Sequence, residues 1–310
     1  MTPKILVNFP TNIGDAIMAL PALDSVKANF PESKVTAILS PNTKEFLSRH
    51  KFIDEFVVYN KHCRIREKVG YAFSLRKGGY QLMLDFKNSL FPLILGVKQR
   101  TPFIRMYPER MPLKERYIRL VKRFIKTDKV ERGGFILDEG EKKNWHLDEF
   151  EGSVFVAAVS KSFLKTYPVK QLKTIIDTIC RRKKVVLLGD ENSKDYYQQI
   201  DSKNNVVDLS GKTSLLDVYY LLKNCASLCL CVDSAILHLA SYVDVPIAAL
   251  FGPTDICKFG PWSRKYKVLA REDLKCRPCG RGSCSYKQVC MDIEAEKILA
   301  AIAELMADKE

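Results

Sequence analysis

The sequence predicts an α/β protein with two domains, each built on a doubly wound parallel sheet. Short apolar runs with the length of buried strands alternate with longer segments that have helical spacing, as in proteins with parallel sheets. A polar, turn-rich segment at 130–152 interrupts the alternation, which then restarts. At 310 residues the chain can hold two domains that each bury a core. We therefore expect domains at 1–150 and 151–310, facing each other across a cleft.

The N-terminal half begins with the apolar run KILVNF, which predicts the first strand at 4–9. A tight loop at 10–15 leads into a helix. Further strands are expected at 35–39, 56–58 and 81–85, and helices at 16–30, 42–50, 65–76, 87–95 and 113–125.

The C-terminal half repeats this architecture without repeating the sequence. Strands are expected at 154–158, 185–188, 206–209, 228–232 and 246–251, and helices at 169–182, from 191, at 215–223, at 235–242 and at the C-terminus. Both halves are therefore predicted to be Rossmann-like.

Two turns in the stretch 228–255 form the clearest candidate site. The first of its strands stops at Asp233-Ser234, residues that favour helix starts. The second ends at the turn Gly252-Pro253-Thr254-Asp255. Ligands of open α/β sheets bind beyond the carboxyl ends of strands, where helix N-termini point at them. The two turns therefore form either a site for a phosphorylated ligand or simply two well-capped strand ends.

Composition restricts the class of protein. The chain has the 46% apolar and 28% charged residues of a globular protein. No apolar run reaches the ~18 residues of a membrane span, and the N-terminus lacks the pattern of a signal peptide. We therefore expect a cytoplasmic protein. The ten cysteines agree with this, because several lie in apolar runs, where a free thiol acts as a small hydrophobic group.

The net charge of +14 indicates an anionic partner. Twelve Lys or Arg residues but only four acidic residues lie between 98 and 132. Nucleic acid, an anionic membrane surface or an acidic glycolipid would each match this segment, and so would a solvated helix face. A nicotinamide or flavin enzyme is poorly supported, because no GxGxxG motif follows the first strand of either half.

Four further residues are candidates for chemistry, and each has a structural alternative. Asp15 follows the first strand, where a carboxylate suits a general base or an N-cap. Lys165 follows the first strand of the C-terminal half and suits a pyrophosphate or plain exposure to solvent. Glu191 follows the next strand and would receive ribose hydroxyls or belong to a helix cap. His238 follows Asp233 on the same helix, and we expect it to pack unless a cleft lies beside it.

One cysteine cluster stands out, with the spacing Cys276-x2-Cys279-x4-Cys284-x5-Cys290. Four thiolates within 15 residues can hold a structural zinc or iron ion. The spacing is looser than a pair of CxxC motifs, so reduced or regulatory thiols are the alternative.

Ordered motifs along nearly the whole chain resemble glycosyltransferase family 9, the ADP-heptose:lipopolysaccharide heptosyltransferases. Each motif alone is weak, but the ordered set is specific. It comprises Asn12-Ile13-Gly14-Asp15, Leu187-Leu188-Gly189-Asp190-Glu191, Leu209-Ser210-Gly211-Lys212-Thr213, Val232-Asp233-Ser234-Ala235 with His238, and Ala249-Leu250-Phe251-Gly252-Pro253-Thr254-Asp255. The segments most similar to the heptosyltransferase II type are Lys87-Asn88-Ser89, Gln99-Arg100-Thr101 and Glu115-Arg116-Tyr117-Ile118.

The resemblance implies a GT-B fold, with the acceptor on the N-terminal domain and the nucleotide sugar on the C-terminal domain. It also implies an inverting transfer that needs no metal cofactor. By position, Asp15 matches the general base, Lys165 the phosphate-binding lysine, Glu191 the ribose-binding acid and Asp233 the acid near the heptose. The other donor-binding residues are Ser234, Ala235, His238 and Thr254, and the acceptor-binding residues are Asn12, Lys87, Asn88, Arg100 and Arg116.

Two positions depart from the family. Ala235 stands where Gly is usual, and Tyr167 stands where Trp is usual. A glycine lets a phosphate approach the backbone closely, whereas alanine permits this only while its φ stays negative. The loop after Arg100 also lacks the glycines expected of the acceptor loop.

We therefore expect a cytoplasmic glycosyltransferase, peripheral to the anionic inner membrane, that uses ADP-heptose and the inner core of lipopolysaccharide. Another nucleotide sugar or another surface-polysaccharide acceptor is the nearest alternative. A nucleic-acid-binding protein with a cysteine metal knuckle is a distant one, because no strand interleaves aromatic and basic residues.

Overall fold

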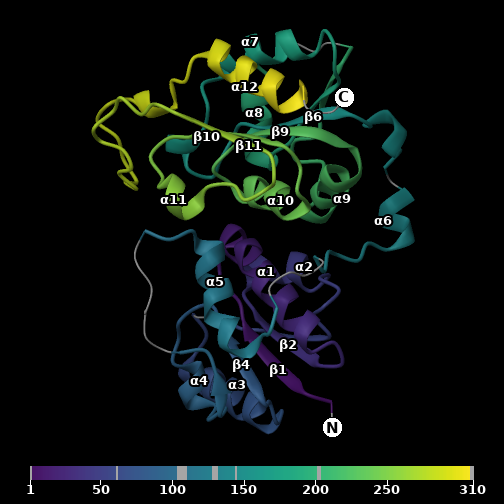
Figure 1. Cartoon of the computed structure of the whole chain (residues 1–310), viewed down its shortest axis with the longest axis vertical. Coiled ribbons are helices and arrows are strands. Elements are labelled where there is room, and N and C mark those ends of the chain that lie inside the picture. Colours follow the sequence, from purple (N-terminus) through teal and green to yellow (C-terminus); the bar gives the residue numbers. More distant parts are fainter. Residues whose placement is uncertain are drawn as a thin grey trace. The chain divides into compact units, whose positions relative to one another are not determined.

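The computed structural model describes residues 2–60, 62–102, 110–127, 132–143, 145–200 and 204–307. It confirms the α/β class, because the chain divides into two compact units, Met1–Leu137 (unit 1) and Asp138–Glu310 (unit 2), each with one parallel sheet (Figure 1). The segment 138–150 belongs to unit 2, where the Trp145 indole donates a hydrogen bond to Asp217 Oδ1 at 2.7 Å. No helix among the described residues is both long and apolar enough to cross a bilayer.

The sheet of unit 1 has the strand order β3-β2-β1-β4-β5. Its strands are β1 (Lys4–Asn8), β2 (Lys34–Leu39), β3 (Glu55–Val58), β4 (Leu82–Asp85) and β5 (Gln99–Arg100), and its helices are α1 (Ile13–Asn29), α2 (Pro41–Leu47), α3 (Ile65–Lys77), α4 (Phe91–Ile94) and α5 (Leu113–Val121), followed by the 3-10 turn η1 (Lys122–Phe124). The chain proceeds from β1 outward to β3 and then returns to the other side of β1 as β4. The order of the strands therefore reverses between β1 and β4, the place where open α/β sheets bind ligands.

The helix predicted at 87–95 is wrong over its first four residues, since α4 covers only Phe91–Ile94. The Asp85 carboxylate accepts the backbone N–H groups of Lys87 and Ser89, at 3.2 and 2.5 Å. Between them, Asn88 has a φ of 56°. The side chain of Asp85 therefore organises a turn where the periodicity of the sequence indicates a helix.

Helix α5 is amphipathic and packs against α1. Its residues Leu113, Tyr117 and Val121 are buried, with the spacing of one helix face. Beyond its end, the N–H groups of Lys126 and Thr127 donate to the Asn29 side-chain oxygen. These contacts bring a distant part of the sequence to the helix that begins beside Asp15.

The sheet of unit 2 has the strand order β11-β10-β9-β6-β7-β8. Its strands are β6 (Ser153–Ala157), β7 (Val185–Leu187), β8 (Val206–Asp208), β9 (Ala226–Val232), β10 (Ile247–Phe251) and β11 (Tyr266–Ala270). Its helices are α6 (Glu139–Lys143), η2 (Leu147–Glu149), η3 (Phe163–Lys165), α7 (Val169–Ile179), η4 (Glu191–Ser193), α8 (Lys194–Tyr197), α9 (Leu215–Cys225), α10 (Ala235–Val243), α11 (Ile256–Phe259), η5 (Val289–Met291) and α12 (Ala295–Ala307), where η marks a 3-10 turn. The strand order reverses between β6 and β9.

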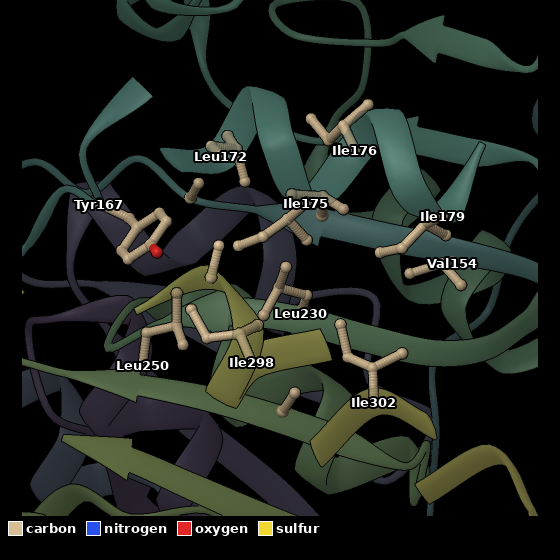
Figure 2. Close-up of a cluster of buried hydrophobic side chains, with 14 of the residues drawn as sticks. Val154, Tyr167, Leu172, Ile175, Ile176, Ile179, Leu230, Leu250, Ile298 and Ile302 are labelled. Atoms are coloured by element: carbon tan, nitrogen blue, oxygen red, sulfur yellow. The ribbon is translucent and has the colours of Figure 1, made fainter. Parts of the chain in front are cut away.

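A layer of aliphatic side chains joins this sheet to α7 and α12. Figure 2 shows Val154, Leu230 and Leu250 of the sheet in one cluster with Ile175 of α7 and Ile298 of α12. All are buried, and burying an aliphatic side chain of this size stabilises the fold by about 1.5–3 kcal/mol. Tyr167 belongs to the same cluster, and its hydroxyl donates to the Ile293 carbonyl at 2.6 Å. The core therefore accommodates tyrosine where the family usually has tryptophan.

Candidate active site

The candidate site of unit 2 lies at the carboxyl ends of four adjacent strands. In the order β10-β9-β6-β7, these strands precede Thr254, Asp233 with Ser234, Lys165, and Glu191. Leu250 of β10 pairs with Val232 of β9, so the two turns singled out in the sequence are neighbours. The predicted donor residues thus gather on either side of the point where the strand order reverses.

Lys165 and Asp233 form the charged centre of this site. Lys165 Nζ lies 2.7 Å from Asp233 Oδ2. The lysine side chain is part-exposed, whereas the aspartate is buried. The Ser160 hydroxyl donates to the backbone carbonyl of Asp233 at 3.5 Å. The ion pair therefore holds an ammonium group at the strand ends, with one side accessible to an anionic ligand.

His238 is buried behind this pair. Its Nε2 lies 3.8 Å from Asp233 Oδ1, and its ring stacks on Trp262 at 5.6 Å. Burial lowers the pKa of His238 to about 4; the Asp233 carboxylate opposes this shift and Lys165 adds to it. The imidazole is therefore neutral at pH 7. It both packs on Trp262 and lies beside Asp233.

Three buried polar atoms in this region have no hydrogen-bond partner among the described residues: Ser234 Oγ, Thr254 Oγ1 and His238 Nδ1. Ser234 precedes α10, but its hydroxyl does not cap that helix. Backbone N–H groups in the first turn of a helix have no partner within the helix, and they attract anions. Because buried polar groups are normally satisfied, these atoms indicate a ligand with several acceptor and donor groups.

Glu191 lies at the edge of the site, just after β7. Its carboxylate contacts Lys194 Nζ at 2.6 Å and is largely exposed. Gly211, with a φ of 66°, lies against it, and a Cβ there would be 2.4 Å from Glu191 Oε2. The positive φ favours glycine at this position, whereas the close contact involves only the exposed end of a flexible side chain. Beside its contact with Lys194, the exposed Glu191 carboxylate is accessible to hydroxyl groups.

At the strand-order reversal of unit 1, side chains of the two adjacent strands hydrogen-bond to each other. Asn8, the last residue of β1, donates to Asp85 Oδ1 of β4 at 2.8 Å, and the Ser89 hydroxyl donates to Asp85 Oδ2 at 3.0 Å. Burial raises the pKa of Asp85, although its hydrogen bonds to Ser89, Asn8 and Lys87 oppose the shift. Sequence reasoning missed this cluster. A polar residue at the end of each apolar run was the signal that could have identified it.

Asp15 lies in the first turn of α1, the helix that follows Asn8 and β1 in the sequence. The Asn12 side-chain amide donates to Asp15 Oδ2 at 3.4 Å. Tyr117 of α5 lies near enough for the Asp15 charge to raise the pKa of its phenol, although burial is the larger cause of that rise. Tyr117 thus lies near Asp15, a proximity that the sequence did not indicate because the two residues are about a hundred positions apart.

The predicted acceptor residues lie on different elements of unit 1. Lys87 and Asn88 lie in the loop after β4, where Lys87 Nζ sits 5.8 Å above the Tyr59 ring. Arg116 precedes Tyr117 on α5. In contrast, the Arg100 guanidinium donates to the Val97 carbonyl at 2.9 Å, toward the start of its strand. The acceptor loop that follows Arg100 lies largely outside the described residues, at 103–109.

The four clustered cysteines share one small cavity. Cys276, Cys279, Cys284 and Cys290 all line a space of about 20 Å³. Cys290 is buried, and burial raises the pKa of its thiol. In the described parts of the chain, no group of three or more His, Cys, Asp or Glu side chains is arranged to hold a metal ion. As placed, these thiols therefore do not form a ligand set, and metal binding stays a prediction.

Comparisons with known proteins agree with this geometry. The family model for Glycosyltransferase family 9 (heptosyltransferase) matches residues 106–290. The lipooligosaccharide heptosyltransferase 2 of Campylobacter jejuni serotype O:6 is 26% identical, over 97% of this chain and 99% of that protein. The solved E. coli ADP-heptose LPS heptosyltransferase II has a TM-score of 0.77 at 21% identity and covers 99% of both chains. E. coli heptosyltransferase WaaC, solved with ADP-2-deoxy-2-fluoro heptose, has a TM-score of 0.69 at 15% identity, covering 99% of this chain and 100% of its own. These likenesses confirm the GT-B fold.

Proposed function

The chain belongs to glycosyltransferase family 9, the heptosyltransferase family, and from that premise we propose that it transfers heptose from ADP-heptose to the inner core of lipopolysaccharide. The names of the curated relatives support the acceptor, and the ligand in the WaaC structure supports the donor. The observation that carries the proposal is the set of unpartnered polar atoms beside Lys165, at the strand-order reversal of unit 2.

The donor proposal assigns each part of ADP-heptose to a group in unit 2. The pyrophosphate lies against the N-terminus of α10, with Lys165, Ser234 and Thr254 as its side-chain partners. Glu191 receives the ribose hydroxyls, and Asp233 lies near the heptose. Ala235 is the first residue of α10, and its φ is not positive. The alanine therefore satisfies the condition that replacing the usual glycine requires.

In the proposed reaction, Asp15 of unit 1 acts as the general base. It removes the proton from an acceptor hydroxyl as the oxygen attacks the anomeric carbon on the face opposite the ADP. The bond from that carbon to the diphosphate oxygen breaks, its electron pair leaves with ADP, and the anomeric configuration inverts. Lys165 and the N–H groups of α10 stabilise the charge that develops on the diphosphate.

The proposal also includes location. A peripheral enzyme on the cytoplasmic face of the inner membrane would meet both ADP-heptose and the membrane-anchored acceptor. The positive net charge supports attachment to an anionic surface, which falls as salt screens it. A different nucleotide sugar or a different surface polysaccharide is the alternative, because Arg100 is turned toward Val97 and the neighbouring loop departs from the family.

The test measures nucleotide release from ADP-, GDP- and UDP-sugars with heptose-free and mono-heptosylated core acceptors. We expect ADP release only from ADP-heptose with the mono-heptosylated acceptor. Asp15→Asn should lower kcat by about 10²–10⁴-fold, the usual contribution of a general base, and leave the Kd for ADP unchanged. The exposed Glu32→Gln variant of the same unit is the control. If Asp15→Asn keeps most of its rate, Asp15 is not the base; release from another donor would change the substrate.

A further inference from the structure

Exposed apolar side chains gather on two neighbouring elements of unit 1. Helix α3 exposes Val69 by 47% and Phe73 by 63%. The start of α4 and the helix itself expose Leu90 by 55%, Leu93 by 49% and Ile94 by 54%. The other exposed large apolar residues of the described chain are Phe56, Ile136, Phe163, Tyr266 and Tyr286. A folded protein seldom leaves such side chains grouped in water without a partner.

The two elements lie side by side in unit 1, as Figure 1 shows. The ring of Tyr59 contacts both, with ring centroids 5.7 Å from Tyr71 of α3 and 5.1 Å from Phe91 of α4. Tyr71 is two positions from both Val69 and Phe73, so this contact lies on a different side of α3 from its exposed apolar residues. We call the area formed by the five exposed residues the α3–α4 surface. The loop after β4, which holds the predicted acceptor residues Lys87 and Asn88, leads through Ser89 into Leu90 and α4.

Basic residues surround this surface. On α3, Arg66 precedes Val69 by three positions and Lys77 follows Phe73 by four, so both lie along the apolar side of the helix. Between His62 and Arg100 the acidic residues are Glu67 and Asp85, of which Asp85 is buried. The basic residues in the same interval are Arg64, Arg66, Lys68, Arg76, Lys77, Lys87, Lys98 and Arg100.

A groove of about 580 Å³ adjoins the surface between the end of α3 and the segment from α4 into β5. Leu75, Leu95 and Val97 line it, and Arg76 and Lys98 lie at its walls. Apolar lining with cationic walls suits an amphiphile with an anionic headgroup. Helix α5, which belongs to the basic segment 98–132, differs, because its apolar residues Leu113, Tyr117 and Val121 are buried. It offers charge without exposed apolar side chains.

We propose that the α3–α4 surface docks unit 1 on an anionic phospholipid bilayer. Its apolar side chains enter the headgroup region while the flanking Arg and Lys side chains contact lipid phosphates, as interfacial helices do. The proposal rests on the proposed function in one respect: a membrane-anchored acceptor has to be met at the bilayer, and this surface adjoins in sequence the loop that holds the predicted acceptor residues Lys87 and Asn88.

The experiment measures binding of the full chain to vesicles, without donor or acceptor, so that its result is independent of the transferase assay. Vesicles of phosphatidylethanolamine with phosphatidylglycerol are compared with vesicles of phosphatidylcholine. We expect binding to the anionic vesicles alone. The double variant Phe73→Gln/Ile94→Gln should weaken it by about 100-fold, because two large apolar side chains no longer enter lipid. The variant Arg76→Gln/Lys77→Gln should weaken it by about 30-fold.

Matched controls come from equally exposed positions. Ile136→Gln removes an isoleucine of unit 1 that is 55% exposed, and Arg181→Gln/Arg182→Gln removes two adjacent exposed arginines of unit 2. Both should bind anionic vesicles like the unaltered protein. Equal binding by the Phe73 and Ile94 variant, or no binding by the unaltered protein, would overturn the proposal. A dimer that dissociates in that variant, without vesicle binding, would instead identify a protein interface. ADP affinity, measured alongside, reports separately on the donor site.

Discussion

The two units reverse their strand order in the same way but fill the resulting position differently. In unit 1, Asn8 and Asp85 connect the two central strands directly, and further hydrogen bonds from Ser89 satisfy the carboxylate. In unit 2, Ser234 and Thr254 leave buried hydroxyls without partners among the described residues. The same topology therefore provides two different polar sites. In unit 1 the Asp85 carboxylate is satisfied within the protein and Asn8 Oδ1 is left without a partner among the described residues, whereas unit 2 leaves two hydroxyls and an imidazole nitrogen, a set of groups suited to a ligand.

The difference shows that fold alone does not determine a site. Hydrogen bonds made within the protein contribute to stability, whereas polar groups left unsatisfied lower it until a ligand satisfies them. Substitutions in unit 1 should therefore affect folding, and matched substitutions in unit 2 should affect ligand binding. Both tryptophans, Trp145 and Trp262, lie in unit 2. Their fluorescence follows that unit, while circular dichroism follows both.

The largest expected effect is on the folding of unit 1. Asp85→Ala should lower its free energy of unfolding by about 3 kcal/mol, because several buried donors lose their acceptor together. Urea unfolding followed by circular dichroism measures the loss, and the Kd for ADP should not change. Asp85→Asn keeps one acceptor oxygen and should lose less. A stable Asp85→Ala variant would show that the cluster does not hold unit 1 together.

Acid should weaken both units through a buried histidine in each. Burial lowers the pKa of His50 to about 3 and that of His238 to about 4 in the folded chain, against 6.5 for an exposed histidine. Below pH 6.5 the unfolded chain binds the extra proton, so stability falls as the pH decreases toward the folded values. From pH 6.5 to 5 each histidine should cost about 2 kcal/mol. His238→Gln should reduce the acid sensitivity seen by tryptophan fluorescence; an unchanged pH profile would contradict this assignment.

The unpartnered hydroxyls of unit 2 should show the opposite behaviour to Asp85. The double variant Ser234→Ala/Thr254→Val removes hydroxyls that make no hydrogen bond with the described residues, so unfolding should require at least as much free energy as before. The Kd for ADP should rise about tenfold, the value of one or two hydrogen bonds. Calorimetric titration measures it. Unchanged ADP affinity would mean that these hydroxyls face something other than the diphosphate.

The smallest expected effect concerns the cysteine loop, which has no counterpart in unit 1. Cys279→Ser/Cys284→Ser replaces two exposed thiols and should change the stability of unit 2 by less than about 0.5 kcal/mol, as at ordinary surface positions. Metal analysis of both proteins is the control. One equivalent of zinc or iron per chain, lost in the variant together with stability, would establish the four-cysteine metal site instead.

The strands were predictable because buried parallel strands appear as short apolar runs. The strands at the edges of the sheets were harder to predict. Strand β11 contains exposed Tyr266 and Lys267, and β5 has only two residues, so neither shows an apolar run. The helix predicted at 87–95 failed for a different reason. Periodicity does not register that the Asp85 side chain takes the N–H groups that would begin it.

The gathering of the proposed donor-binding residues at one edge of the sheet was predictable from the sequence, because each follows a strand and parallel strands align their carboxyl ends. The ion pair of Lys165 with Asp233 and the stacking of His238 on Trp262 were not. They depend on where loops between different strands meet. The position of Tyr117 near Asp15 likewise depends on how α5 packs on α1. Sequence patterns identify which residues reach a site, while tertiary packing determines which of them touch.

The cysteines of the central strand have a consequence for how unit 2 can be observed. Cys229 and Cys231 are buried in β9, between β6 and β10, and burial raises the pKa of Cys231 well above that of a free thiol. Neither sulfur reacts while the sheet is intact, because only an exposed thiolate is an effective nucleophile. Their rate of alkylation therefore measures how often the sheet opens. Nucleotide that holds the ends of β9 and β10 together should slow that rate in proportion to its occupancy.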